Sequence, residues 1–293
     1  MTKNAEAKIL FGTAGTPESA EESTMAGMRE IARIKLDTME LEFVQGVRLG
    51  RPKAEEIGAL ARELNMPLSC HAPYYVNLAA KEPQKIEDSI KRIMDSARIG
   101  AICGVDNVIF HAGFFMGRDA ETVYAMIRDN MLRIREMLDA EGLKGVTLRP
   151  ELTGKPSAFG SPEELFRLCR DVPGALPCID FSHMFARTQG EFNSYDDFCR
   201  LLEAQGKSLG DKSLKNFHAH LSGIEYTAAG EKRHLNVKDS KIKYRDVLKA
   251  LSAMGVQGRV ICESPDRAHD AGVFKKYWNR CLVEKAGGAE CEV

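Results

Sequence analysis

Six apolar segments of the chain each end in a histidine or an acidic residue. The clearest runs from Ala175 to Ile179 and stops at Asp180, with His183 three residues later. The other five segments end at His71, His111, Glu151, His220 and Glu263. Imidazole and carboxylate groups bind Zn²⁺, and Mn²⁺ or Fe accept similar ligand sets. Because three carboxylates gathered without a cation would repel one another, the pattern predicts that the protein binds metal, and more than one ion.

The apolar segments have the length of β-strands and alternate with longer amphipathic helices. The predicted strands cover residues 9–13, 39–44, 67–71, 107–111, 146–151, 175–180, 216–220 and 259–263. The predicted helices cover residues 20–35, 54–64, 85–102, 120–140, 244–254 and 268–283, and a further helix begins at the Ser161-Pro-Glu-Glu164 capping box. Strict alternation of eight strands with helices predicts an α/β fold, a single (β/α)8 barrel domain spanning residues 1–293. A doubly wound open sheet also alternates and remains the alternative, although its GxGxxG fingerprint is missing.

In a barrel the carboxyl ends of the strands meet around one mouth, where active sites form. The six strand-end residues should therefore converge there. A single histidine at a strand end is usually just a hydrogen-bonded polar group, but six successive ends of this kind favour a common site. On the seventh strand, His218 and His220 must share a face, and we expect His220 to be the ligand with His218 packed beneath it.

Composition places limits on the partners of the protein. The 293 residues are 44% hydrophobic and 28% charged, with a formal net charge of −1, so nucleic-acid contact would need a local basic surface. No apolar run is long enough to span a membrane, and the polar residues Met1 to Lys8 lack the apolar core of a signal peptide. The eight cysteines form no CxxC pair. We therefore expect a cytoplasmic protein with reduced cysteines, no membrane association and no obligate protein partner.

Several longer motifs carry a family resemblance. They are His71-Ala-Pro-Tyr-Tyr-Val-Asn-Leu78, Phe110-His-Ala-Gly113, Pro150-Glu-Leu-Thr-Gly154, Phe159-Gly-Ser161, Cys178-Ile-Asp-Phe-Ser-His183, His220-Leu-Ser-Gly223, Arg233-His234 and Cys262-Glu-Ser264. In this order they resemble the endonuclease IV family of apurinic/apyrimidinic endonucleases, within the wider xylose-isomerase-like TIM barrels.

The resemblance implies a zinc-dependent DNA-repair endonuclease that cuts duplex DNA on the 5′ side of abasic sites. It implies two or three Zn²⁺ ions, with Mn²⁺ or Fe as possible replacements. The first would be held by His71, His111 and Glu151, the second by Glu151, Asp180, His220 and Glu263, and the third by His183 and His234. Glu151 and Glu263 would be the catalytic residues, with Glu151 bridging two ions and Glu263 orienting the nucleophile. The substrate-binding residues would be Tyr74, Arg187 and Arg233, among a set of basic loop residues around the mouth. For Tyr74, packing beside Tyr75 is an equally good interpretation.

This chain departs from the family at the third ion. The family has an Asp-Arg-His triplet where the chain has Lys232-Arg233-His234, with Glu231 one step earlier. That ion could be held through Glu231 or water, bound weakly, or absent. The loop after the second strand also lacks the family's DNA-opening pattern. Two alternatives therefore stay open: a sugar isomerase or epimerase of the same superfamily, and a non-catalytic protein that binds metal or nucleic acid.

Overall fold

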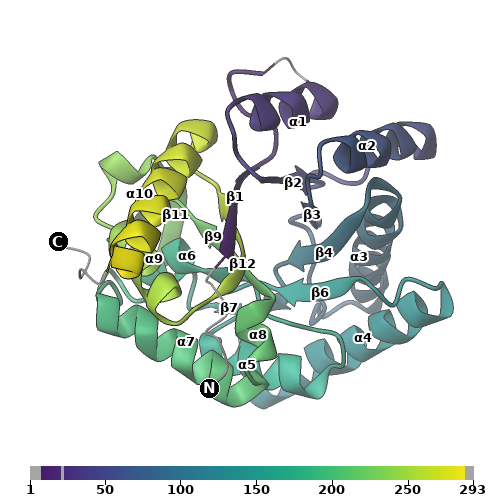
Figure 1. Ribbon diagram of the computed structural model, residues 1–293. Helices are drawn as coiled ribbons and strands as arrows, with labels where there is room; N and C mark the ends of the chain where they lie inside the picture. The colour runs from purple at the N-terminus through teal and green to yellow at the C-terminus, as the bar shows by residue number, and fades with distance from the viewer. Residues whose placement is uncertain (1–7, 21–22, 288–293) are drawn as a thin grey trace.

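The protein is a barrel of eight parallel strands surrounded by helices, as Figure 1 shows for the computed structural model. The structure describes residues 8–20 and 23–287. The strands follow one another around the barrel in the order β6-β4-β3-β2-β1-β12-β9-β8. Their bounds are β1 Lys8–Ala14, β2 Thr38–Glu42, β3 Leu68–His71, β4 Val105–Phe110, β6 Thr147–Pro150, β8 Ile179–Asp180, β9 Phe217–Leu221 and β12 Gln257–Cys262. The predicted (β/α)8 barrel is confirmed.

The barrel closes between β6 and the segment that leads into β8. This seam has two isolated parallel bridges, Leu148 to Ala175 and Glu151 to Cys178. The amide of Cys178 donates to the carbonyl of Pro150 at 3.0 Å, and the amide of Leu152 donates to the carbonyl of Cys178 at 3.0 Å. The amide of Leu176 donates to the carbonyl of Leu148 at 3.1 Å, and the amide of Leu148 donates to the carbonyl of Gly174 at 3.3 Å. Closure therefore rests on four backbone hydrogen bonds, and those of Cys178 flank Glu151.

Helices cover the outside of the barrel. They are α1 Thr24–Arg33, α2 Arg51–Glu63, α3 Pro83–Cys103, α4 Ala120–Ala140, α5 Pro162–Asp171, α6 Phe181–Arg187, α7 Tyr195–Leu209, α8 Lys212–Lys215, α9 Tyr244–Ala253 and α10 Arg267–Gly287, with a 3₁₀ turn η1 at Val237–Asp239. The predicted capping box begins α5, because Ser161 Oγ accepts from the Glu164 amide while the Glu164 carboxylate accepts from the Ser161 amide. Three helices, α6 to α8, occupy the stretch between β8 and β9, for which the sequence pattern gave no element.

Some sequence expectations fall at the edge of the described chain. The first helix begins at Thr24 and not at Ala20, and residues 21–22 lie outside the described residues. Most of the polar stretch from Met1 to Lys8 also lies outside them. None of the described helices is both long and apolar enough to cross a bilayer. No disulfide joins the cysteines of the described part of the chain.

Two short antiparallel strand pairs, the second of them a hairpin, extend from the mouth of the barrel and were not predicted. One pairs β5 (Gly113–Phe114) with β7 (Ala158–Phe159), and the other pairs β10 (Gly223–Thr227) with β11 (Gly230–Leu235). In the second hairpin Glu225 pairs with Arg233 and Tyr226 pairs with Glu231, so a β-bulge leaves Lys232 as the extra residue. This bulge decides which side chains of β11 face the mouth.

The barrel interior is polar, whereas the layer between strands and helices is apolar. Phe11, Phe110 and Trp278 are among the largest buried apolar side chains. Inside the barrel, the guanidinium of fully buried Arg149 donates to Asn107 Oδ1 and to the carbonyls of Pro177 at 3.0 Å and Asn216 at 2.8 Å. These partners offset the desolvation of the charge and tie four strand segments together.

Candidate metal centre

The six predicted strand-end residues come together at the carboxyl end of the barrel. They fall into two groups, and within each group the ligand atoms all lie within 4.8 Å of one another. The first group is His71, His111 and Glu151, and the second is Glu151, Asp180, His220 and Glu263. The strands position these side chains: His71 ends β3, Asp180 ends β8, His220 lies in β9, and His111, Glu151 and Glu263 directly follow β4, β6 and β12.

Glu151 belongs to both groups because its two carboxylate oxygens face different histidines. Oε2 lies 3.0 Å from the Nε2 atoms of both His71 and His111. Oε1 lies 3.0 Å from Nδ1 of His220 and 3.4 Å from Nδ1 of His183. One buried carboxylate therefore stands between two sets of potential ligands, which is the arrangement of a bridging ligand.

Hydrogen bonds away from the centre orient three of the histidines. Nδ1 of His71 donates to the carbonyl of Ala72 at 2.7 Å, and Nδ1 of His183 donates to the carbonyl of Leu152 at 2.9 Å. Nδ1 of His234 bonds the hydroxyl of Ser222 at 2.7 Å. For His71 and His183, a proton on Nδ1 leaves the Nε2 lone pair free to bind a cation.

The ligands predicted for the third ion are less closely grouped than those of the first two. The rings of His183 and His234 have centroids 5.7 Å apart. Glu231 Oε2 lies 3.1 Å from Nε2 of His183 and accepts from the Gly154 amide at 3.0 Å. Lys232, the residue at the bulge, instead places Nζ 2.7 Å from Oε1 of Glu225. The side chain that faces His183 is therefore that of Glu231 and not that of Lys232.

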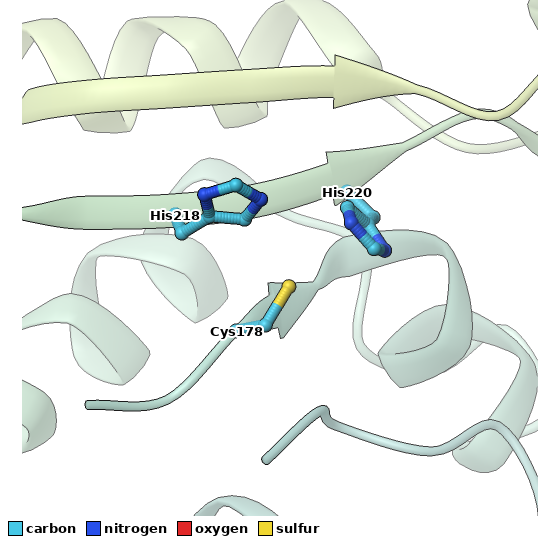
Figure 2. A group of neighbouring side chains, drawn as sticks. All are labelled: Cys178, His218 and His220. Atoms are coloured by element: carbon cyan, nitrogen blue, oxygen red, sulfur yellow. The ribbon is translucent and has the colours of Figure 1, made fainter. Parts of the chain in front are cut away.

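A second layer lies beneath the mouth and includes an acid that sequence reasoning missed. His218 is fully buried one layer below His220, as predicted, and its Nε2 donates to Oε2 of Glu40 at 3.0 Å. Figure 2 shows the two histidines of β9 with the sulfur of Cys178 pointing toward them. The sequence pattern places Glu40 within the predicted strand 39–44 and gives it no role at the site. The available signal was that Glu40 and Glu42 share one face of β2, which had to point either into the barrel or toward the helices.

Charge coupling perturbs the acid–base groups of the centre. Burial alone would raise the pKa of Glu151, but the charges of His111 and His220 hold it well below its usual value. Burial would lower the pKa of His71, but its hydrogen bond to Glu151 and that residue's charge raise it to about 9. Burial raises the pKa of Glu263 to about 7. Protons on the histidines therefore balance the carboxylates, and a cation must displace those protons.

The donor set fits a divalent metal such as Zn²⁺. Oδ2 of Asp180 and Oε2 of Glu263 are buried and lack a hydrogen-bond partner among the described residues. Among these residues the two oxygens contact imidazoles: Nδ1 of His183 lies 3.1 Å from Asp180 Oδ2, and Nε2 of His234 lies 3.9 Å from Glu263 Oε2. Buried carboxylate oxygens without hydrogen bonds are costly, and a bound cation would offset that cost. The combination of imidazole nitrogens and carboxylate oxygens suits Zn²⁺, Mn²⁺ or Fe better than Ca²⁺ or Mg²⁺, which prefer oxygen ligands alone.

A cavity of about 300 Å³ opens onto these groups. Its wall includes Tyr74, Phe114, Lys155, Lys232 and Arg233, besides most of the candidate ligands. The Tyr74 side chain is exposed, and its ring centroid lies 5.6 Å from that of His71. The three cations are paired with acids: Lys155 with Glu231 at 3.6 Å, and Lys232 and Arg233 with Glu225 at 2.7 and 2.6 Å.

Arg187 has a different environment from the one predicted. Its Nη1 donates to the carbonyls of Thr153, Lys155 and Ala158, at 2.7 to 3.2 Å, and the residue is not part of the cavity wall. The contacts show that it fixes the loop between β6 and β7. A role in substrate binding stays a prediction for Arg187, as it does for Tyr74 and Arg233.

Comparison with known proteins agrees with this architecture. The profile of the xylose isomerase-like TIM barrel family matches residues 28–278. An uncharacterized protein of Methanocaldococcus jannaschii is 43% identical over 276 residues, which cover 94% of this chain and 99% of that protein. Two solved structures share the fold at low identity. Endonuclease IV from Thermus thermophilus has a TM-score of 0.70 at 20% identity, covering 92% of this chain and 99% of that chain. A D-tagatose 3-epimerase-like protein has a TM-score of 0.71 at 19% identity, covering 95% and 100%. Since the family profile spans most of its length, this chain belongs to the xylose isomerase-like TIM barrel family.

Proposed function

We propose that the protein is a metal-dependent phosphodiester hydrolase of the endonuclease IV type, acting on DNA at abasic sites. The observation that supports this most directly is the position of Glu151 between two ligand groups, with His71 and His111 on one oxygen and His220 on the other. Two cations sharing a carboxylate suit phosphoryl chemistry, because attacking and leaving oxygens can be stabilised together. A single ion held by Glu151, Asp180, His220 and Glu263 would leave His71 and His111 without a ligand role.

Bound cations of this kind activate water and neutralise charge that develops on phosphoryl oxygens. The protein side chains have separate tasks in the proposal. Glu151 sets the spacing between the two ligand groups through its two oxygens. Glu263 has a buried oxygen without a hydrogen-bond partner and contributes to the cavity wall, so it can accept a proton from the nucleophilic water and orient it.

The wall of the cavity supports binding of an extrahelical nucleotide. Tyr74 offers an exposed aromatic face beside His71 on which a base or sugar can pack. Lys155, Lys232 and Arg233 line the other part of the wall and can contact phosphates. Because each is already paired with an acid, we expect a moderate dependence of binding on salt and not the steep dependence of a strongly basic surface.

A sugar isomerase or epimerase is the second candidate. The group of Glu151, Asp180, His220 and Glu263 could hold one cation by itself. The cavity of about 300 Å³ is near the lower limit for small-molecule sites and has the size to enclose a monosaccharide. The family fold accommodates this chemistry as well, since the D-tagatose 3-epimerase-like structure shares it.

One assay separates the two candidates. Zinc-loaded protein is incubated with a duplex oligonucleotide that carries one abasic analogue, beside an undamaged duplex and, separately, a panel of ketoses and aldoses. The proposal expects strand scission 5′ to the abasic position only. Glu263→Gln should remove scission, while Glu55→Gln, on the exposed face of α2, should retain it.

Sugar turnover without scission would replace the proposal with the second candidate. Binding of the abasic duplex without scission or turnover would indicate a non-catalytic protein. His111→Gln adds a further discrimination: it should abolish a two-cation reaction, whereas the one-cation group does not contain His111.

A further inference from the structure

Glu40 is a fully buried carboxylate located behind His220. It lies on β2 and reaches β9 across the barrel interior. Its Oε2 accepts hydrogen bonds from Ser69 Oγ at 2.7 Å and from His218 Nε2 at 3.0 Å. Its Oε1 lies 2.9 Å from Nε2 of His220. Burying a carboxylate costs several kcal/mol of folding free energy unless it is well paired. The partners of Glu40 are therefore informative about its role.

The two ring nitrogens of His220 face different acids. Nδ1 lies 3.0 Å from Glu151 and 3.5 Å from Glu263, on the side of the candidate metal centre. Nε2 faces Glu40 on the interior side. A histidine that binds a metal commonly donates its other ring N–H to a carboxylate, which fixes the tautomer and makes the ligand more basic. We propose that Glu40 is a positioning residue that holds the proton of His220 on Nε2 and so leaves Nδ1 free to bind a divalent cation.

Two unsatisfied atoms support this pairing. Glu40 Oε1 and His220 Nε2 are both buried, and neither has a hydrogen-bond partner in the described part of the chain. They are nevertheless separated by only 2.9 Å, a hydrogen-bond distance that is poorly aligned.

Cys178 is the competing partner for the interior side of His220. Its sulfur and the ring nitrogens of His218 and His220 lie within 4.8 Å of one another, and Figure 2 shows the thiol directed between the two rings. A thiol is a weak hydrogen-bonding group and, unlike a carboxylate, brings no negative charge to the imidazole. The charge of Glu40 therefore makes it the stronger partner.

This inference rests on the cation-binding part of the proposed function and not on its substrate, so the test measures metal binding alone. Zn²⁺ affinity is determined for the full chain by competition with a fluorescent chelator. Glu40→Gln keeps the size of the side chain and removes the charge, and it should weaken the site containing His220 by about 10–100-fold. Cys178→Ala should have little effect. Glu55→Gln, which removes a charge on the exposed face of α2, is the control and should leave the affinity unchanged.

A second measurement reports directly which ring nitrogen of His220 carries the proton. Nitrogen-15 histidine NMR of the zinc-loaded wild type, with His220→Gln to assign the signal, should show Nε2 protonated and Nδ1 bound to metal. The opposite tautomer would overturn the inference even if Glu40→Gln failed to fold. Unchanged affinity in folded Glu40→Gln would overturn it and leave the proposed function intact. A wild-type protein that binds no Zn²⁺ would overturn this inference and the metal-dependent function together.

Discussion

Removing divalent cations with a chelator is expected to lower the melting temperature of the protein by about 10 °C. The reason is that the buried carboxylates around Glu151 have few other partners: Asp180 Oδ2 and Glu263 Oε2 lack hydrogen bonds among the described residues. A cation that binds only the folded state adds its binding free energy to the stability of that state.

The size of the effect follows from the number of ligand groups. Two groups converge on Glu151, so the calculation covers the two ions that these groups would hold. At a free metal concentration of about 100 times the dissociation constant, each ion contributes about 2.7 kcal/mol, or about 5 kcal/mol for both. For a chain of 293 residues, 1 kcal/mol corresponds to about 2 °C in melting temperature, which gives the value above.

Differential scanning calorimetry of zinc-loaded and chelated protein measures this shift. Glu151→Gln should lose most of the difference, because both ligand groups lose their shared member. Glu55→Gln, outside the centre, should show the same difference as the wild type. An identical melting temperature with and without chelator would refute the reasoning, as would a full shift in Glu151→Gln.

Three other predictions concern the barrel, its acid chemistry and the β10–β11 hairpin. Gly12→Ala should lower the free energy of unfolding, measured by urea denaturation, by about 3 kcal/mol or more. The reason is that the added Cβ would stand 2.0 Å from the carbonyl oxygen of Thr38. An unchanged urea midpoint would contradict the close contact of β1 with β2. Burial raises the pKa of Glu42 to about 8. A carboxyl with a raised folded-state pKa favours folding at low pH and loses that contribution as the pH rises through the folded value, so the chelated wild type should lose stability relative to Glu42→Gln between about pH 5 and pH 9. A stability difference that stays constant over this range would count against the raised pKa of Glu42. Glu231→Gln should reduce the amount of zinc retained after dialysis, measured by elemental analysis, because Glu231 faces His183. Lys232→Ala should not, because Lys232 pairs with Glu225. The reverse result would contradict the position of the β-bulge at Lys232.

The barrel was predictable because each strand carries its own signal. Apolar runs of strand length, separated by helical periodicity, recur eight times, and a closed ring is a simple way to bury all of them. Elements without that signal were not predicted. The β10–β11 hairpin is short and rich in charged residues, so it has no apolar alternation, and α6 begins at once after Asp180 with no loop to mark it.

The strand-end ligands were predictable for a geometric reason, and the rest of the centre was not. Parallel strands bring their carboxyl ends together, so the six terminal residues meet whatever the loops do. Glu40 was missed because the alternation of β2 does not say which face points into the barrel. Glu231 could be named only as one possibility, because a one-residue bulge changes which side chains face the site and has no distinctive sequence pattern.

The seam between β6 and the segment before β8 has a mechanical consequence. Four backbone hydrogen bonds join its two sides, with Glu151 on one side and Asp180 on the other. A cation bound by both acids would link β6 to β8 across this seam. Metal binding and stabilisation of the closed barrel would then be coupled. Amide hydrogens along the seam should exchange with solvent faster after the metal has been removed.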